Sequence, residues 1–150
     1  MKYIKNGLLG LITLCLISCA TPYQKVTAFT MSGGYYDEKL PTGEYKVGFG
    51  GNGYTSTTLA MDYTLLRCAN IAIENNKDFF EIVQGGGGRK DDAYWNGYGI
   101  SYASKPSVEY IIRLHDSEPE KPEGKVFNAV DTKNLIKKRN SLDDSYRVQK

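Results

Sequence analysis

The stretch YKVGFGGNGYTSTTLAMDYTLLRCANIAI, residues 45–73, decides the fold, because it joins a strand pattern to a helix pattern across a glycine-rich bend. Apolar and polar positions alternate over residues 45–49, which is typical of a strand with one buried face. Apolar residues then recur in steps of three and four, which predicts a helix over residues 56–75. Thr55 or Ser56 can cap this helix by accepting a hydrogen bond from an amide of its first turn.

The bend contains Gly48, Gly50 and Gly53 in the spacing G-x-G-x-x-G, which also occurs at the phosphate-binding turn of dinucleotide-binding folds. That fold requires a preceding strand that is apolar on both faces, whereas the strand here alternates. The next apolar segment, residues 79–83, runs into glycines and carries no carboxylate at its end that could bind a ribose hydroxyl. We therefore interpret the bend as a connection between a hairpin and a helix, and we expect no cofactor.

The amino terminus has the organisation of a secretory signal. A short basic head precedes an apolar block over residues 7–18, which is too short for a permanent membrane span. Residues 16–19 (LISC) resemble the lipobox of bacterial lipoproteins. The resemblance implies cleavage between Ser18 and Cys19, a diacylglycerol on the Cys19 thiol, and an acyl chain such as palmitate on the new amine. Two or more acyl chains would hold the protein on a membrane almost permanently.

We therefore expect the mature chain to face the periplasm from a membrane of the bacterial envelope. Ala20, rather than an aspartate, follows the cysteine, which favours the outer membrane over the inner membrane. The precursor has 19 basic and 17 acidic residues, and loss of Lys2 and Lys5 with the signal makes these numbers equal. A neutral chain lacks the basic excess of a nucleic-acid-binding protein, so no nucleic acid partner is expected.

The cysteines give a further expectation about the mature chain. Cys15 lies in the signal and Cys19 is the predicted lipid site, which leaves Cys68 of the three cysteines. A single remaining thiol predicts no disulfide within the mature chain. Cys68 falls in the predicted helix, where we expect it to be buried as a small apolar residue.

The rest of the chain predicts one α+β domain over residues 33–139, a two-layer sandwich of a small antiparallel sheet, one main helix and a short C-terminal helix. The expected order is β-β-α-β-β-α, with late strands at residues 79–83 and 107–114 and a last helix capped by Asp131 or Thr132. The remaining segments are expected to be the signal (1–18), a tether (19–32), a flexible glycine connector (85–88), a small hairpin or folded loop (93–104), a charged linker (116–125) and a flexible tail (140–150).

An aromatic cluster in a glycine-rich segment is the first candidate site: Tyr94, Trp95, Tyr98 and Tyr102. Aromatic side chains offer a large rigid surface and can anchor a protein partner or stack on sugar rings. They can equally cover the open edge of a small core, which is the interpretation that we favour. Both interpretations remain open at this point.

His115 is the second candidate, because it is the only histidine in the chain and precedes Asp116. One histidine cannot build a histidine-rich metal site, and the sequence has no G-x-S-x-G elbow of a serine hydrolase. We expect a surface histidine and predict no catalytic or metal-binding residue. The alternative is a small periplasmic hydrolase or ligand-binding protein that uses residues 85–116, and it requires a pocket that joins His115 to a carboxylate and a hydroxyl.

Three segments carry a family resemblance: GGY at residues 33–35, GNGYTSTTLAMDYTLLRCANIAIENNKDFFEIV at 51–83, and FNAVDTKNLI at 127–136. They resemble a family of small, uncharacterised envelope lipoproteins of Gram-negative bacteria. The resemblance implies that the bend joins a hairpin to a helix and that the protein is lipid-anchored, and it brings no known activity. Cys68 departs from the small residue usual at that helix position. Our hypothesis is a non-enzymatic lipoprotein that binds an envelope protein or glycan through its exposed loops.

Overall fold

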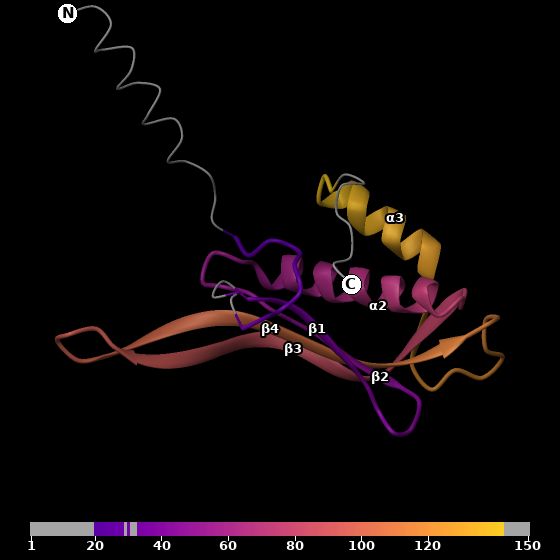
Figure 1. Ribbon diagram of the computed structural model, residues 1–150, viewed down its shortest axis with the longest axis horizontal. Helices are drawn as coiled ribbons and strands as arrows, with labels where there is room; N and C mark the ends of the chain where they lie inside the picture. Colours follow the sequence, from indigo (N-terminus) through magenta and orange to yellow (C-terminus); the bar gives the residue numbers. More distant parts are fainter. Residues whose placement is uncertain (1–19, 29, 31–32, 143–150) are drawn as a thin grey trace, which may run out of the picture.

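The computed structural model describes residues 20–28, 30 and 33–142, and these form an antiparallel sheet of five strands with two helices (Figure 1). The helix α2 packs against the sheet, and α3 packs against α2 and β5, which gives the two-layer α+β fold expected from the sequence. The strand order is β1-β2-β4-β3-β5. The elements are β1 (Gly34–Lys39), β2 (Tyr45–Gly50), α2 (Thr57–Glu74), β3 (Phe79–Trp95), β4 (Ile100–His115), β5 (Lys125–Asn128) and α3 (Ala129–Arg139).

The first hairpin and the main helix form as predicted. β1 pairs with β2 through a turn in which Gly43 adopts a φ of +90°, a conformation that glycine tolerates. Ser56 is the N-cap of α2, because its Oγ accepts a hydrogen bond from the amide of Leu59 at 3.0 Å. Thr55, the other candidate cap, instead donates its hydroxyl to Asn52 Oδ1.

The core lies between α2 and the face of the sheet that α2 covers. Phe49, Phe80 and Ile112 from three strands are fully buried. Cys68 of α2 is also fully buried, as predicted, and burial raises the pKa of its thiol far above the ordinary value. The Cys68 sulfur therefore contributes packing and is shielded from solvent.

Part of the predicted tether belongs to the folded domain. Thr21 and Tyr23 are buried, the Tyr23 ring lies 4.7 Å from the ring of Tyr35, and Asn70 Nδ2 donates to the Tyr23 hydroxyl at 3.0 Å. Residues 19–32 show no sustained periodicity, which led us to expect a solvated tether. Burial of the Tyr23 ring instead favours packing of this segment on the domain. The predicted signal (1–18), its cleavage at Ser18 and the lipid site Cys19 lie outside the described residues.

The end of the domain differs from the prediction in a similar way. Asn140 and Leu142 lie in the predicted tail, yet Asn140 Nδ2 donates to Asp62 Oδ2 at 2.9 Å and Leu142 packs against the core. Asn128 caps α3, because its Oδ1 accepts from the amide of Asp131. The predicted caps Asp131 and Thr132 are therefore wrong by one turn. Residues 143–150 of the tail lie outside the described part of the chain.

The largest correction concerns the glycine run and the loop after it, because β3 and β4 form one long hairpin (Figure 1). Their pairing continues without a break from Gln84–Ile111 to Trp95–Ile100. The expected flexible connector at residues 85–88 is thus a strand, and residues 93–104 are the end of this hairpin. The backbone ladder with β4 holds the glycines extended, although glycine alone has little preference for a strand.

One strand was missed at the end of the predicted charged linker. β5 begins within that linker and pairs with the first four residues of β3, from Phe79–Asn128 to Ile82–Lys125. The Phe80 and Phe127 rings stack at 5.3 Å across this pairing. The observed order is therefore β-β-α-β-β-β-α, one strand more than the sequence predicts.

Candidate functional site

The β3–β4 hairpin extends past the N-terminal end of α2 as an arm, which we define as residues 90–105 (Figure 1). The arm begins beyond the directly opposed pair Arg89–Pro106 and ends at the turn between Trp95 and Ile100. β5 pairs with β3 only as far as Ile82, so among the described residues no strand covers the outer edge of β3 along the arm. The arm is therefore a projecting element with its backbone edge accessible.

The turn at the end of the arm is held by its own hydrogen bonds. Asn96 Oδ1 accepts from the amides of Tyr98 and Gly99, each at 3.0 Å, and Gly97 adopts a φ of +94°. Asn96 Nδ2 donates to the hydroxyl of Ser101. These contacts fix the turn before any partner binds, which lowers the entropy lost on binding.

Large apolar side chains crowd this turn and are exposed. The exposed fractions are 70% for Trp95, 99% for Tyr98, 68% for Ile100 and 71% for Tyr102. The interpretation that these aromatic residues cover the core is therefore wrong for Trp95, Tyr98 and Tyr102. Tyr94 pairs with Ser101 along the backbone, and its side chain lies outside what the structure describes. Ile100 also belongs to this surface, although it is not among the aromatic residues predicted from the sequence.

Three of these side chains share one face of the arm. Trp95 is directly opposite Ile100, and Ala93 is directly opposite Tyr102. Because opposed residues of an antiparallel pair point to the same side and successive residues alternate, Trp95, Ile100 and Tyr102 lie on the face that α2 covers farther along the sheet. We call these three residues the arm stripe. Beyond the end of α2 no described element covers it (Figure 1).

The base of the arm is joined to the first described residues of the chain. Arg89 donates to the carbonyl of Thr55 at 3.4 Å, and Gly51 donates its amide to the carbonyl of Pro106 at 2.9 Å. Thr55 Oγ1 in turn accepts from the amide of Thr21 at 3.0 Å. The point at which residue 21 enters the fold therefore lies at the base of the arm.

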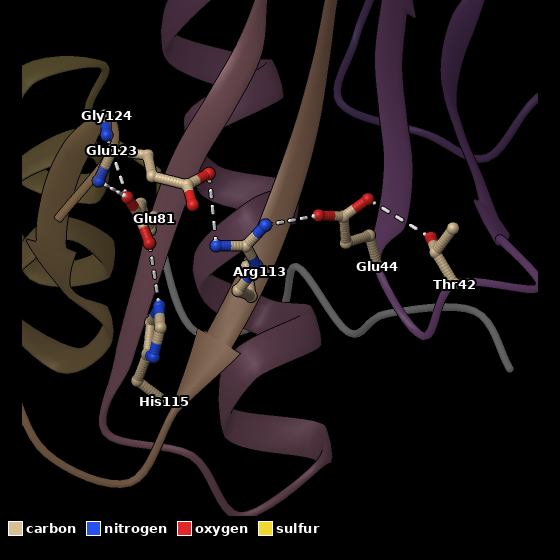
Figure 2. A network of polar contacts seen from close by, with 7 residues as sticks. All are labelled: Thr42, Glu44, Glu81, Arg113, His115, Glu123 and Gly124. Atoms are coloured by element: carbon tan, nitrogen blue, oxygen red, sulfur yellow. Dashed lines mark hydrogen bonds and ion pairs between the residues drawn. The ribbon is translucent and has the colours of Figure 1, made fainter. Parts of the chain in front are cut away.

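His115 lies on the other face of the sheet, in a polar network (Figure 2). Its Nε2 is 2.9 Å from Oε2 of Glu81, a carboxylate that is only 1% exposed. Glu81 Oε1 accepts from the amides of Glu123 and Gly124. Burial raises the pKa of Glu81, but hydrogen bonds from Gly124, His115 and Glu123 together outweigh burial and hold this pKa below its ordinary value.

The second half of this network is an ion-pair chain. Arg113 donates to Glu44 Oε1 at 2.9 Å and lies 3.4 Å from Glu123 Oε2, so it links the turn before β2 to the loop before β5 (Figure 2). A pocket beside it is lined by Arg113 and Leu114 but not by His115. No hydroxyl bonds to His115 among the described contacts. The constellation required by the hydrolase alternative is thus only half present, as a carboxylate and an imidazole.

Packing explains one glycine of the G-x-G-x-x-G motif, Gly48. A Cβ added at Gly48 would lie 2.3 Å from the ring of Tyr36, whose hydroxyl donates to Glu109 at 2.9 Å across the sheet. Gly50 and Gly53 have open space at the Cβ position. Both neighbours of β2 are antiparallel, so the motif does not lie at a crossover between parallel strands.

An apolar groove between α2, β3 and β5 was not predicted. Met61 and Leu65 of α2, Gly85 of β3 and Phe127 of β5 line it, together with Ile82, Gly86, Tyr110 and Lys125. The groove opens because β5 is short and because glycines in β3 place no side chains over it. Only the strand pairing reveals this juxtaposition, since the lining residues come from distant segments.

The described residues contain neither a candidate metal cluster nor a helix able to span a membrane. In residues 20–28, 30 and 33–142, no group of three or more His, Cys, Asp or Glu side chains is arranged to hold a metal ion. Neither helix of that part combines the length and apolar character needed to cross a membrane. Comparison with protein-family models, curated proteins and solved structures finds no match in any of the three. The family resemblance of the sequence therefore stays a prediction.

Proposed function

We propose that this chain is a lipoprotein of the bacterial envelope, anchored through acylated Cys19 and facing the periplasm, that acts by binding rather than by catalysis. The lipobox at residues 16–19 supports the anchor, and Ala20 supports the outer membrane as its location. The observation that carries the binding role is the projecting arm, which extends beyond the packed body of the domain (Figure 1). Its end carries exposed aromatic side chains. Its partner is a component of the envelope.

Several large apolar side chains at the end of the arm are exposed together. Monomeric proteins rarely leave several large apolar residues together in solvent unless they contact something. Trp and Tyr are enriched where partners bind, because they lose few torsional degrees of freedom for the area that they bury. Since the turn at Asn96 is already ordered by hydrogen bonds, the arm presents these side chains at little further entropic cost.

The test combines mass analysis with crosslinking in cells. Intact mass of the membrane-extracted protein is expected to show loss of residues 1–18 and the addition of acyl chains at Cys19. A photo-crosslinking residue in place of Tyr98 is expected to capture an envelope component, whereas the same residue in place of Val130, an exposed residue of α3, is expected to capture none. A non-acylated mature chain, or equal capture at both positions, would contradict the proposal.

The alternative of a small hydrolase or ligand-binding protein is favoured by one observation, the contact between Glu81 and His115. A carboxylate that orients an imidazole is half of a nucleophile-activating arrangement. Both Glu81 oxygens are already occupied, by His115 on one side and by the amides of Glu123 and Gly124 on the other. Turnover of an ester or amide substrate that disappears in His115→Ala, with the fold intact by circular dichroism, would establish this alternative.

A further inference from the structure

We propose that the end of the arm is a second membrane contact: Trp95, Tyr98, Ile100 and Tyr102 insert into the surface of the bilayer that holds Cys19. This inference rests on the proposed anchor and names the lipid bilayer as the partner of the exposed arm. It leaves the outer edge of β3 and the apolar groove for any protein partner.

The first step is that the predicted anchor at Cys19 is close in the chain to the first buried residue of the domain, Thr21. Thr21 is 1% exposed and bonded to Thr55, so it is fixed in the domain. Cys19 precedes Thr21 by two residues, and two residues of extended chain span at most about 7 Å. A bilayer that holds acyl chains at Cys19 therefore lies directly against the domain, with no tether to separate them.

The second step is the position of the arm relative to that point. The hydroxyl of Thr55 accepts a hydrogen bond from the amide of Thr21, and the carbonyl of Thr55 accepts one from Arg89 at the base of the arm. Five residue pairs lie between Arg89–Pro106 and Trp95–Ile100. The six steps along the strand correspond to a length of about 20 Å. The arm is thus short enough for its end to reach the bilayer to which its base is attached.

The third step is orientation. Arg89 and the arm stripe lie on the same face of β3 and β4, and Arg89 reaches the loop that holds Thr21. By strand register, the stripe therefore belongs to the face of the sheet on which the chain enters. Figure 1 shows the entering segment, in indigo, near the N-terminal end of α2. A membrane located by Cys19 lies on the side to which Trp95 and Ile100 point.

The fourth step is the chemistry of the two faces. The stripe is aromatic and aliphatic, and Trp and Tyr prefer the boundary between lipid headgroups and acyl chains. On the opposite face lie Lys90, Asp92 and Lys105, and Lys105 pairs with Asp92 at 3.1 Å. Asp91 shares the face of the stripe, but it lies closer to the base than Tyr102 does. The arm therefore has one apolar face at its end, and its charged residues lie on the opposite face or nearer the base. This amphipathic arrangement suits shallow insertion into a bilayer.

A tip of four side chains binds a bilayer weakly by itself, and the anchor makes the contact effective. Tethering confines the tip near the surface and raises its effective lipid concentration to the millimolar range or above, about the range for short linkers. Burial of a side chain such as Ile100 then shifts the balance between inserted and solvated tip by roughly tenfold or more.

The experiment uses Trp95, which is the only tryptophan in the chain. The full-length protein is expressed in bacteria, extracted from membranes and placed in phosphatidylcholine vesicles with or without brominated acyl chains. Brominated lipid is expected to quench Trp95 emission, and acrylamide in the aqueous phase is expected to quench it little. Ile100→Ser is expected to shift the inserted fraction toward solvent by roughly tenfold. The control Val130→Ser, at a residue of α3 that is 52% exposed, is expected to leave quenching unchanged.

Intact mass and vesicle flotation of the same sample separate the inference from the anchor. An acylated, floating protein whose Trp95 is open to acrylamide and untouched by brominated lipid overturns the inference and leaves the anchor standing. A non-acylated protein whose Trp95 is still quenched by brominated lipid overturns the anchor and leaves only the membrane contact of the arm. A non-acylated protein without quenching overturns both. Acrylamide protection that grows with protein-to-lipid ratio, without brominated-lipid quenching, assigns the tip to a contact between proteins and overturns the inference.

Discussion

Glu81 and His115 lie 2.9 Å apart on the face of the sheet opposite the helices, and the remaining oxygen of Glu81 holds the backbone of the loop before β5 (Figure 2). The carboxylate thus joins the end of β4 to a loop that the sequence presents only as a charged linker. This contact organises structure, and it makes stability depend on pH.

The first prediction concerns acid stability. The folded state lowers the pKa of Glu81 below the value of about 4.3 in an unfolded chain. A lowered carboxyl pKa contributes stability above the unfolded value, and this contribution is lost as the pH falls through the folded pKa. We expect Glu81→Gln to destabilise the protein by about 1.5–3 kcal/mol at pH 7, because a charged acceptor of three donors is removed.

Urea unfolding of wild type and Glu81→Gln at pH values from 7 to 3 checks this prediction. The difference in unfolding free energy is expected to shrink toward the acid end, since both chains then carry a neutral group at position 81. Glu118→Gln, at an exposed residue of the neighbouring loop, is the control and should follow wild type. A difference that stays constant over the whole range would contradict the assignment.

The second prediction concerns the buried guanidinium of Arg67. Its side chain is 7% exposed and pairs with Asp37 and Glu74, each at 2.8 Å, so its pKa is raised although burial alone would lower it. Asp37 is 19% exposed whereas Glu74 is 42% exposed. We expect Asp37→Ala to cost about 1.5–3 kcal/mol of stability and Glu74→Ala less than about 1 kcal/mol, because solvent already screens the second pair. Chemical denaturation of both variants measures the contrast, and equal losses would refute it.

The third prediction separates the glycines of the G-x-G-x-x-G motif. Gly48→Ala must displace the Tyr36 ring and is expected to cost about 1–3 kcal/mol. Gly50→Ala meets open space and is expected to change stability by less than about 0.5 kcal/mol. Thermal unfolding of the two single variants provides the measurement. A neutral Gly48→Ala would mean that Tyr36 does not lie across Gly48 in solution.

The fourth prediction tests the glycine run as a strand. Gly85 has a φ of +128° and follows the bulge between Ile82 and Gln84, and a Cβ there would meet the carbonyl of Glu109. We expect Gly85→Ala to destabilise the protein by about 1–3 kcal/mol. Gly86→Ala has open space and is expected to be neutral or slightly stabilising, because alanine restricts the unfolded chain. Equal and negligible effects in chemical denaturation would instead indicate a flexible connector.

Local sequence patterns were sufficient to predict an element where that element buries one of its faces against the core. The alternation before the bend predicted β2, and the three- and four-residue periodicity after it predicted α2. Each pattern has the side-chain period of the element that forms there. The burial of Cys68 followed from its place on the apolar side of that helix. His115 was expected at the surface, but its side chain is only 21% exposed and its imidazole is paired with the buried Glu81.

Local sequence patterns failed where a segment is structured only by contacts with residues distant in the chain. Gly85 and the glycines after it have no side chains to reveal a strand, and only pairing with β4 shows that they form one. Tyr23 looks like part of a tether because its partners, Tyr35 and Asn70, lie 12 and 47 residues away in the chain. The exposure of Trp95 follows from the length of β3 relative to α2, a quantity that no short window contains.

The sequence by itself determined the fold class, the first hairpin, the main helix and the prediction of a lipid site at Cys19. Each of these depends on residues that are close together in the chain, where side-chain periodicity and short motifs operate. Only the tertiary structure decided that the arm projects beyond α2, that its stripe faces the side where the chain enters, and that Glu81 and His115 meet. These relationships depend on strand register and on contacts between distant segments, because a shift of one residue in register would turn every side chain of the arm to the opposite face.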